Sequence, residues 1–496
     1  MESLTALSVL AVPLVFAVAM WRSARSAGAL PALLAAAAIV CVDAFGIVDL
    51  NLGAVQNIML LLVAGLGWIV SRFSEHYLAG DPGQPRFFRW LNALLASVTL
   101  VIVADNLVVF WLAWVSISLS LHQLLLFYPE RLRAALAAHK KFVFARIADA
   151  ALLTAFVLFY WQYQTLSIDN LATIWRSGES LPVSMQIAAC LIVLVAVLKC
   201  AQMPFHGWLI QVVEAPTPVS ALLHAGVVNL GGFLLLRLSS LLELSGAASG
   251  LLLVVAGASL VLAALIAITR ISIKVNLAWS TVAQMALMLV QISLGLYALA
   301  MLHLVAHSCY KAYAFLNSGS QVQQFVTASA APGGGARFHT ALFGTLVAFA
   351  GYLYLASQFE LAISTPEWLL LALYSIGFGS LWRRRGWLLS LGMVVALVSL
   401  HLSLKTAIES HLILPASSAP DWALIWTALV ILALATGGWL MRFGRNSALR
   451  QTLSRHLYAG LYLDEWATRL TLAVWPVRLP KPFTLKPDTI VKETQP

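Results

Sequence analysis

Charged residues are scarce in this sequence. Only 10% of its 496 residues are Asp, Glu, Lys or Arg, whereas a typical soluble domain has about 25%. Hydrophobic residues make up 61%, the mean hydropathy is +0.88, and the apolar runs follow one another with almost no polar insert. These absences exclude a soluble globular protein and predict an all-α polytopic membrane protein. The net charge of +10 is carried in short loops, a pattern typical of membrane orientation rather than of nucleic-acid binding.

Cysteine is scarce as well. The four cysteines, Cys41, Cys190, Cys200 and Cys309, all lie in apolar segments, and the sequence has no CxxC motif or Cys/His cluster. This excludes a disulfide framework and a structural zinc site, so we expect neither metal nor cofactor in this chain. The first 20 residues lack a basic segment before their apolar core, which favours a retained first helix over a signal peptide.

Apolar runs long enough to cross a bilayer recur along the whole chain. We expect 13–15 transmembrane helices. The candidate spans are 4–21, 29–49, 54–71, 89–104, 106–127, 142–162, 185–203, 217–240, 248–268, 274–292, 295–317, 339–357, 368–382, 386–404 and 421–441. Basic residues gather in alternate loops, which predicts an external N-terminus and a cytoplasmic C-terminus.

Two polar segments stand apart from these spans. We predict a membrane domain over 1–441 and a polar cytoplasmic tail over 442–496. Residues 453–475 have helical spacing of large apolar side chains, which predicts an amphipathic helix at the interface or on a partner. The proline-rich end from Pro476 is expected to be extended, and 318–338 to be a Ser/Gly/Ala-rich loop.

The stretch from Lys199 to Gly232 is unusually polar for its depth. It carries Lys199, His206, Glu214 and His224, with prolines at 204, 216 and 218. Charged side chains at membrane depth cost about 2.5–3.5 kcal/mol each on insertion scales. Prolines interrupt helices, and irregular backbone is tolerated there only beside protein or a wet cavity. We therefore predict a broken helix near 200–218 that belongs to an ion pathway.

A second polar cluster lies on the eleventh span. His303, His307 and Lys311 are spaced i, i+4 and i+8, so they share one helix face over about 12 Å. Such a row can relay protons. The alternatives are two core histidines with a snorkelling lysine, or a metal pair, although no acidic residue accompanies the histidines nearby.

Other titratable residues leave two interpretations open. Arg146 and Asp149, at i and i+3, predict an intramembrane ion pair that either neutralises charge or takes part in transport. Glu214 is an interfacial partner or a pathway entrance. Lys274 begins the tenth span and also fits membrane anchoring, and Lys405 is expected to snorkel from the end of the fourteenth.

Four motifs resemble the antiporter-like subunits of respiratory complex I and of the multisubunit cation/proton antiporters. They are K-x-A-Q-x-P-x-H-x-W-L from Lys199, E-x-P-T-P-V-S-A-L-x-H-A from Glu214, I-K-x-x-x-A-x-S-T-x-x-Q from Ile273, and H-x-x-x-H-x-x-x-K-A from His303. The match spans about 90–320. Within that family, HAGVVNLGG, AWSTVAQM and LHLVAHSCYKAYAFLNSGS look like the membrane subunits of DAB inorganic-carbon transporters.

The resemblance implies a fold and a set of roles. It implies two inverted five-helix repeats, with Lys199 as the central pathway lysine and His224 as the next relay group. The route would continue through Lys274, His303, His307 and Lys311.

The resemblance also implies a setting. The chain would be a transporter subunit of the bacterial inner membrane rather than an enzyme. Flux of H⁺ or Na⁺ would drive uptake of CO2 or bicarbonate with DabA, a cytoplasmic partner that carries zinc. The alternative is a proton-pumping subunit of a quinone oxidoreductase or of a multisubunit cation/proton antiporter.

The sequence departs from the family pattern at two points. The fifth helix of the family carries a glutamate that pairs with the broken-helix lysine, and Val115 stands in its place here. Asp149, Glu214 and Asp105 are the candidate substitutes. The lysine of the second repeat has no match around 339–360.

Overall fold

The computed structural model describes residues 9–21, 28–47, 50, 52–128, 130–178, 180–319, 338–358, 363–379, 387–411, 419–443 and 448–475. The long helices are α2 (Ala11–Trp21), α3 (Ala29–Ala44), α4 (Ala54–Tyr77), α5 (Gln84–Val103), α6 (Leu107–Leu125), α7 (Leu132–Tyr163), α9 (Val183–Lys199), α14 (Gly246–Ile268), α15 (Ile273–Ser293), α16 (Tyr297–Leu316), α18 (Phe338–Gln358), α19 (Thr365–Gly379), α20 (Trp387–Glu409) and α21 (Asp421–Phe443). The predicted loop at 318–338 and the end from Pro476 lie almost wholly outside the described residues.

The all-α membrane architecture predicted from composition is confirmed. Nine helices among the described residues are long and apolar enough to cross a membrane, and four shorter helices are apolar too. The largest error in a boundary is at the sixth predicted span. The span predicted at 142–162 begins ten residues earlier, because α7 is a single 32-residue helix. Lys140 and Lys141, expected in a basic loop, therefore lie within a helix.

The break predicted near 200–218 is confirmed. α9 ends at Lys199, and Ala201 has a positive φ of 51°. Two short pieces follow, α10 (Gly207–Gln211) and the 3₁₀ turn η2 (Val212–Glu214). Helical structure resumes at α11 (Thr217–Ala225), which has proline in its first turn, where a missing N–H costs least. A 3₁₀ turn, η3 (Val227–Asn229), and α12 (Leu230–Arg237) complete this run.

The broken run occupies the centre of the molecule. In the span Thr217–Arg237, 94% of the residues in its apolar 18-residue stretch are buried, against 17% in the span Asp421–Met441. α11 packs against α4 and α16, and α12 packs against α9. The approach of α12 to α9 is close, because a Cβ at Gly231 would lie 2.6 Å from Cys200 Sγ. Irregular backbone at membrane depth is thus covered by protein, as its unpaired polar groups require.

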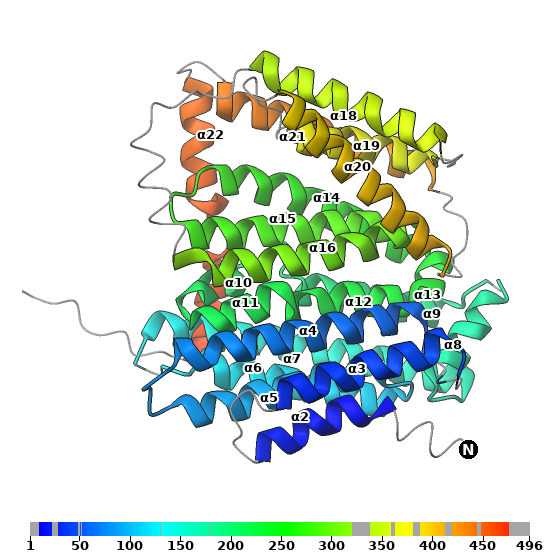
Figure 1. The fold of residues 1–496 in the computed structure, drawn as a ribbon, viewed down its shortest axis with the longest axis vertical. Helices are drawn as coiled ribbons and strands as arrows, with labels where there is room; N and C mark the ends of the chain where they lie inside the picture. The colour runs from blue at the N-terminus through cyan, green and yellow to red at the C-terminus, as the bar shows by residue number, and fades with distance from the viewer. Residues whose placement is uncertain are drawn as a thin grey trace, which may run out of the picture.

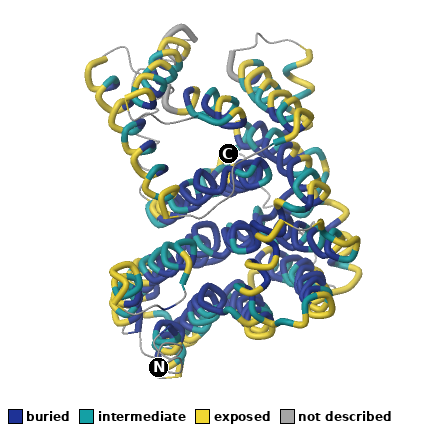
Figure 2. Tube along the Cα trace, turned by 90° about the vertical axis from the view of Figure 1, so that its right-hand side faces the viewer, coloured by how far each residue is buried: buried dark blue, intermediate teal, exposed yellow. Residues whose placement is uncertain are grey.

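Helices α18–α21 form a group at the end of the molecule opposite α2 (Figure 1). α18, α19 and α20 share a small core of their own, built around Tyr352, Leu371, Val394 and Leu402, whereas α21 packs into the main core through Ala423 and Val430. α20 contacts α16, and α21 contacts α14. Figure 2 shows exposed residues along much of this group and buried ones through the centre of the molecule. In a bilayer, the exposed apolar faces would meet lipid.

The tail is not one amphipathic helix. It forms α22 (Ala448–Tyr458) and α23 (Glu465–Val474), separated by a turn in which Gly460, Leu461 and Tyr462 all have positive φ. α22 packs against α14 and α21, and α23 packs against α7. The described part of the tail is therefore folded onto the chain itself. Two short helices, α8 (Ile168–Arg176) and α13 (Ser239–Leu244), connect the long ones at the opposite end of α7.

Candidate functional site

Lys199 lies at the end of α9, directly before the break. Its Nζ is 4.4 Å from the centroid of a Trp114 ring on α6, a cation–π contact. Among the described residues, no carboxylate lies within ion-pair distance of this ammonium. The carboxylate that interacts electrostatically with Lys199 is that of Asp149 on α7. Lys199 is thus a partly buried cation held mainly by an aromatic face.

Asp149 has a second cation beside it. The predicted ion pair is present, with Arg146 Nη2 2.6 Å from Asp149 Oδ2. Asp149 is 5% exposed, and the exposed fraction of the Arg146 side chain is 35%. Asp149 therefore interacts with both Arg146 and Lys199.

The structure separates the three candidates for the missing glutamate. Val115 adjoins Trp114 on α6, as the sequence indicates. Glu214 lies at the surface, where its carboxylate is 3.8 Å from Arg133. Asp105 lies 3.8 Å from Arg237, away from Lys199. Of the three, Asp149 is the one with an electrostatic interaction with Lys199.

Lys141 joins this cluster, although the sequence predicted a loop there. It is 5% exposed and donates to the backbone oxygen of Ser118, at 2.8 Å, and to the Ser118 hydroxyl, at 3.1 Å. Electrostatic interactions link it to Lys199 and Asp149. Pattern analysis missed it because a lysine near a span boundary looks like positive-inside anchoring.

The second cluster forms where α11, α15 and α16 meet. His224 is fully buried, its Nδ1 is 3.1 Å from the Thr281 hydroxyl, and its ring stacks on Phe315. Lys311, also fully buried, donates to the Leu277 backbone oxygen at 2.8 Å and to the Ser280 hydroxyl. Among the described residues, its hydrogen-bond acceptors are thus neutral.

The histidine row on α16 continues from this lysine. Electrostatic interactions join His307 to Lys311, His303 and His224. The His303 and His307 rings are 6.3 Å apart, so the predicted helix face is present. In the part of the chain that the structure describes, no hydrogen bond joins Lys199 to His224, and the two clusters are separate.

Sequence analysis missed a third cluster, on α19 and α20. Lys405 was expected to snorkel, but it is 4% exposed and lies 2.6 Å from Glu367 and 3.4 Å from Glu409. His401, one turn earlier on α20, interacts electrostatically with Lys405 and with His303. The prediction failed because Glu367 is remote in sequence and gives no local signal at Lys405.

Lys274 stands apart from the three clusters, beside a cavity. Its Nζ is 3.0 Å from the Thr217 hydroxyl at the start of α11. A cavity of about 670 Å³ opens beside it, lined also by Phe73, Tyr77 and Ser272. An ammonium facing this space is accessible to water, unlike Lys311.

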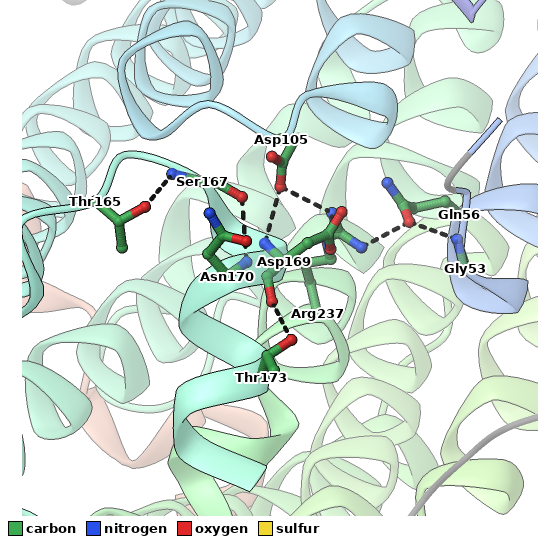
Figure 3. A network of polar contacts seen from close by, with 9 residues as sticks. All are labelled: Gly53, Gln56, Asp105, Thr165, Ser167, Asp169, Asn170, Thr173 and Arg237. Carbon is green, nitrogen blue, oxygen red and sulfur yellow. Dashed lines mark hydrogen bonds and ion pairs between the residues drawn. The ribbon is translucent and has the colours of Figure 1, made fainter. Parts of the chain in front are cut away.

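A polar network closes the opposite end of α7 (Figure 3). The Arg237 guanidinium is 2.8 Å from Asp169, 3.8 Å from Asp105, and donates to Gln56 Oε1 at 2.6 Å. The backbone N–H of Asp169 donates to Asp105 Oδ1 at 2.8 Å. Gln56 also accepts from the Gly53 N–H. The network ties α4, α8 and α12 together.

No metal site accompanies these clusters in the described ranges, where no group of three or more His, Cys, Asp or Glu side chains is placed to hold an ion. The three clusters instead contain lysines and an arginine, histidines, and the carboxylates of Asp149, Glu367 and Glu409. Chemically, each cluster holds side chains that can bind or release a proton.

Comparisons with known proteins identify related membrane proteins. Residues 104–331 match the family described as NADH:quinone oxidoreductase/Mrp antiporter, TM, and 49–88 match the complex I chain 5 N-terminus. The chain is 43% identical to "Probable inorganic carbon transporter subunit DabB" of Hydrogenovibrio crunogenus, over 88% of this chain and 85% of that protein. It is 38% identical to DabB2 of Halothiobacillus neapolitanus, over 91% and 84%. Both names describe transporter subunits, not enzymes.

The solved structures add the fold. The chain is similar to a chain of the Mrp complex from Dietzia, with a TM-score of 0.56 and 21% identity, over 97% of this chain and 56% of that one. At this identity the likeness concerns architecture alone. It confirms the antiporter-like fold that the motifs predicted.

Proposed function

The chain belongs to the family of the DabB inorganic carbon transporter subunits, and on that premise we propose that it translocates protons to energise uptake of inorganic carbon. It would lie in the bacterial inner membrane, with its N-terminus outside and its C-terminus in the cytoplasm. Carbon chemistry would take place on a DabA-like cytoplasmic partner that carries zinc.

One observation supports the proposal above others: buried and partly buried titratable side chains follow one another across the bundle. Lys199 and Asp149 begin the row, His224 and Lys311 continue it, and His307 and His303 extend it towards Lys405. Ionisable side chains inside a membrane domain are expensive and mark ion or proton routes by default. Lys199 and His224 would exchange a proton through water, since no direct bond joins them.

Asp149 takes the part of the absent glutamate in this proposal. It is shared between Arg146 and Lys199, so its charge can favour either cation. When Lys199 is protonated, Asp149 is drawn towards it. When Lys199 has given up its proton, the carboxylate remains with Arg146. A valine at 115 therefore leaves the lysine with a switching partner on α7 instead of α6.

Lys274 and the cavity beside it supply an entrance. In the proposed orientation the loop between α14 and α15 faces the cytoplasm, so water in the 670 Å³ cavity would reach the Lys274 ammonium. Thr217, its hydrogen-bond partner, begins α11, and His224 lies two turns along the same helix. Glu214, half-exposed beside Arg133, would lie at the same membrane surface as a second point of access.

The decisive experiment removes Lys199 in the intact system. Lys199→Ala, expressed with the partner in a host lacking carbonic anhydrase, should abolish growth that depends on inorganic-carbon uptake. Proton flux into vesicles carrying the complex should fall roughly 10²-fold, the usual contribution of a positioned proton-transfer group.

Arg72→Ala is the matched control. This side chain is 59% exposed on α4 and, among the described residues, its ion-pair partner is Glu75, so growth and flux should be unchanged. Full growth of the Lys199→Ala strain would contradict the pathway role. Co-purification with quinone-reductase subunits instead of a zinc-bearing partner would contradict the carbon-uptake role.

A further inference from the structure

The C-terminal segment contacts the broken helix, although the two are far apart in sequence. Residues 448–475, here called the strap, run from α21 past the end of α14 to α7. Arg270, in the loop between α14 and α15, donates to the Leu457 backbone oxygen at 3.3 Å and lies 5.3 Å from the Tyr458 ring centroid. These contacts hold the turn between α22 and α23 in place, and α23 lies beside the start of α10.

Asp464 is the central contact of the strap. Its two carboxylate oxygens accept from Lys140 Nζ at 2.9 and 2.8 Å, and Oδ2 also accepts from Gln211 Nε2 at 3.0 Å. The third acceptor of Lys140 is the Thr468 hydroxyl, at 2.8 Å. Lys140 is fully buried, so its ammonium depends on the strap for compensation. One carboxylate joins α23 to both α7 and α10.

The backbone of α10 fits closely against this carboxylate. A Cβ at Gly207, the first residue of α10, would overlap Asp464. Just before it, the Phe205 ring lies edge-on to Trp466 of α23, with centroids 5.8 Å apart, and Phe144 of α7 completes the cluster. The strap therefore contacts the irregular segment at Phe205, Gly207 and Gln211, within the discontinuity of the helix.

The same turn of α7 faces the pathway. Lys140 binds the strap, whereas its neighbour Lys141 binds Ser118 on α6 and interacts with Lys199 and Asp149. The segment after Lys199 is thus held on one side by the end of α9 and on the other by Asp464. The Lys140–Asp464 ion pair is thus placed beside the irregular segment, where Asp464 also accepts from Gln211.

We propose that Asp464 is a positioning residue of the pathway: it holds residues 200–216 in the arrangement that keeps Lys199 beside Asp149, so that the strap and the pathway move together. This inference rests on the proposed function for its role in transport. The mechanical part, that Asp464 restrains the segment, stands on the contacts alone.

Hydrogen exchange tests the mechanical part without any transport assay. In the full-length chain in lipid nanodiscs, Asp464→Asn should speed exchange of the 207–214 amides roughly ten- to a hundredfold, because hydrogen bonds to charged groups restrain local opening by that factor. Glu465→Gln is the control, since the neighbouring carboxylate is 55% exposed and its ion-pair partner in the described part of the chain is Arg469, on the same helix. It should leave exchange unchanged.

A second variant guards against misfolding. Lys140→Met combined with Asp464→Asn removes both members of the pair, so no buried charge is left alone, and the 207–214 amides should still exchange faster. Unchanged exchange of these amides in both variants would overturn the restraint.

Proton flux through the complex in vesicles tests the role in transport. Asp464→Asn should lower it about tenfold, at a fixed partner content, because a misplaced relay group loses rate by factors of this order. Faster exchange with unchanged flux would overturn the positioning role. Lys199→Ala, measured in parallel, separates this result from failure of the proposed function, since that failure would leave its flux unchanged too.

Discussion

Lys199 and Lys405 are both lysines within membrane helices, yet their surroundings differ. Lys405 is 4% exposed and bound at 2.6 Å to Glu367, with Glu409 at 3.4 Å. Lys199 has the face of Trp114 and shares a more distant carboxylate with Arg146. Lys405 thus belongs to a closed ion pair between α19 and α20. Lys199 is a cation whose nearby carboxylate, Asp149, already pairs with Arg146.

The difference indicates at which of the two lysines a change of protonation costs less free energy. Neutralising either member of a buried ion pair leaves the other as an uncompensated buried charge, so a change of protonation there is costly. A lysine against an aromatic face loses less when its charge goes, because a cation–π contact is worth about 0.5–2 kcal/mol. We therefore expect the Lys199 region to respond to protonation and the Lys405 region to hold the α18–α21 group in place at the end of the row.

The largest expected effect is on stability, at Lys405. Lys405→Met should lower the free energy of unfolding by about 3–5 kcal/mol, because Glu367 is left buried without its cation. Chemical denaturation of the purified chain in detergent measures this. Lys199→Met should cost no more than about 2 kcal/mol, the upper worth of its cation–π contact.

Adding Glu367→Gln to Lys405→Met sharpens this prediction. The double variant removes both charges and should recover most of the lost stability. Equal destabilisation by the two lysine substitutions would remove the contrast between the regions.

An intermediate effect is expected at Asp149. Asp149→Asn keeps a polar group beside Arg146 but removes the charge that Lys199 shares, so proton flux should fall roughly tenfold, about 1.4 kcal/mol in barrier height. Flux into vesicles carrying the complex measures it. Asp105→Asn is the control, because that carboxylate belongs to the Arg237 network. If the two variants conducted equally well, Asp149 would not replace the missing glutamate.

The smallest effect is expected at Glu409. Its carboxylate side chain is 44% exposed and pairs with Lys405 at i, i+4 on the same helix. Glu409→Gln should lower the free energy of unfolding by only about 0.3–0.5 kcal/mol. Denaturation in the same detergent compares it with Glu367→Gln, which should cost several times more. A large loss at Glu409 would mean that it, and not Glu367, holds Lys405.

Local sequence patterns predicted those features that depend on local chemistry. The break after Lys199 follows from prolines at 204, 216 and 218, and the face of His303, His307 and Lys311 follows from helical spacing. The Arg146–Asp149 pair is likewise a local i, i+3 contact.

Contacts between remote segments could not be predicted in this way. Lys405 meets Glu367, and Lys140 meets Asp464, across long separations in sequence. The same lysines near the ends of apolar runs fit snorkelling or anchoring equally well. Asp149 was one of three candidates for the missing glutamate, and packing of α7 against α9 was needed to separate it from the others.

The length of α7 has a consequence of its own. Its 32 residues form an uninterrupted rod of about 48 Å, longer than the roughly 30 Å apolar layer of a bilayer. Its C-terminal end adjoins the Arg237 network, and Lys140, about two turns from its N-terminal end, contacts the strap. A rod is stiff along its axis, so a tilt of about 5° would shift one end by about 4 Å relative to the other. A tilt of this single helix can thus couple a movement at one surface of the membrane to a movement at the other.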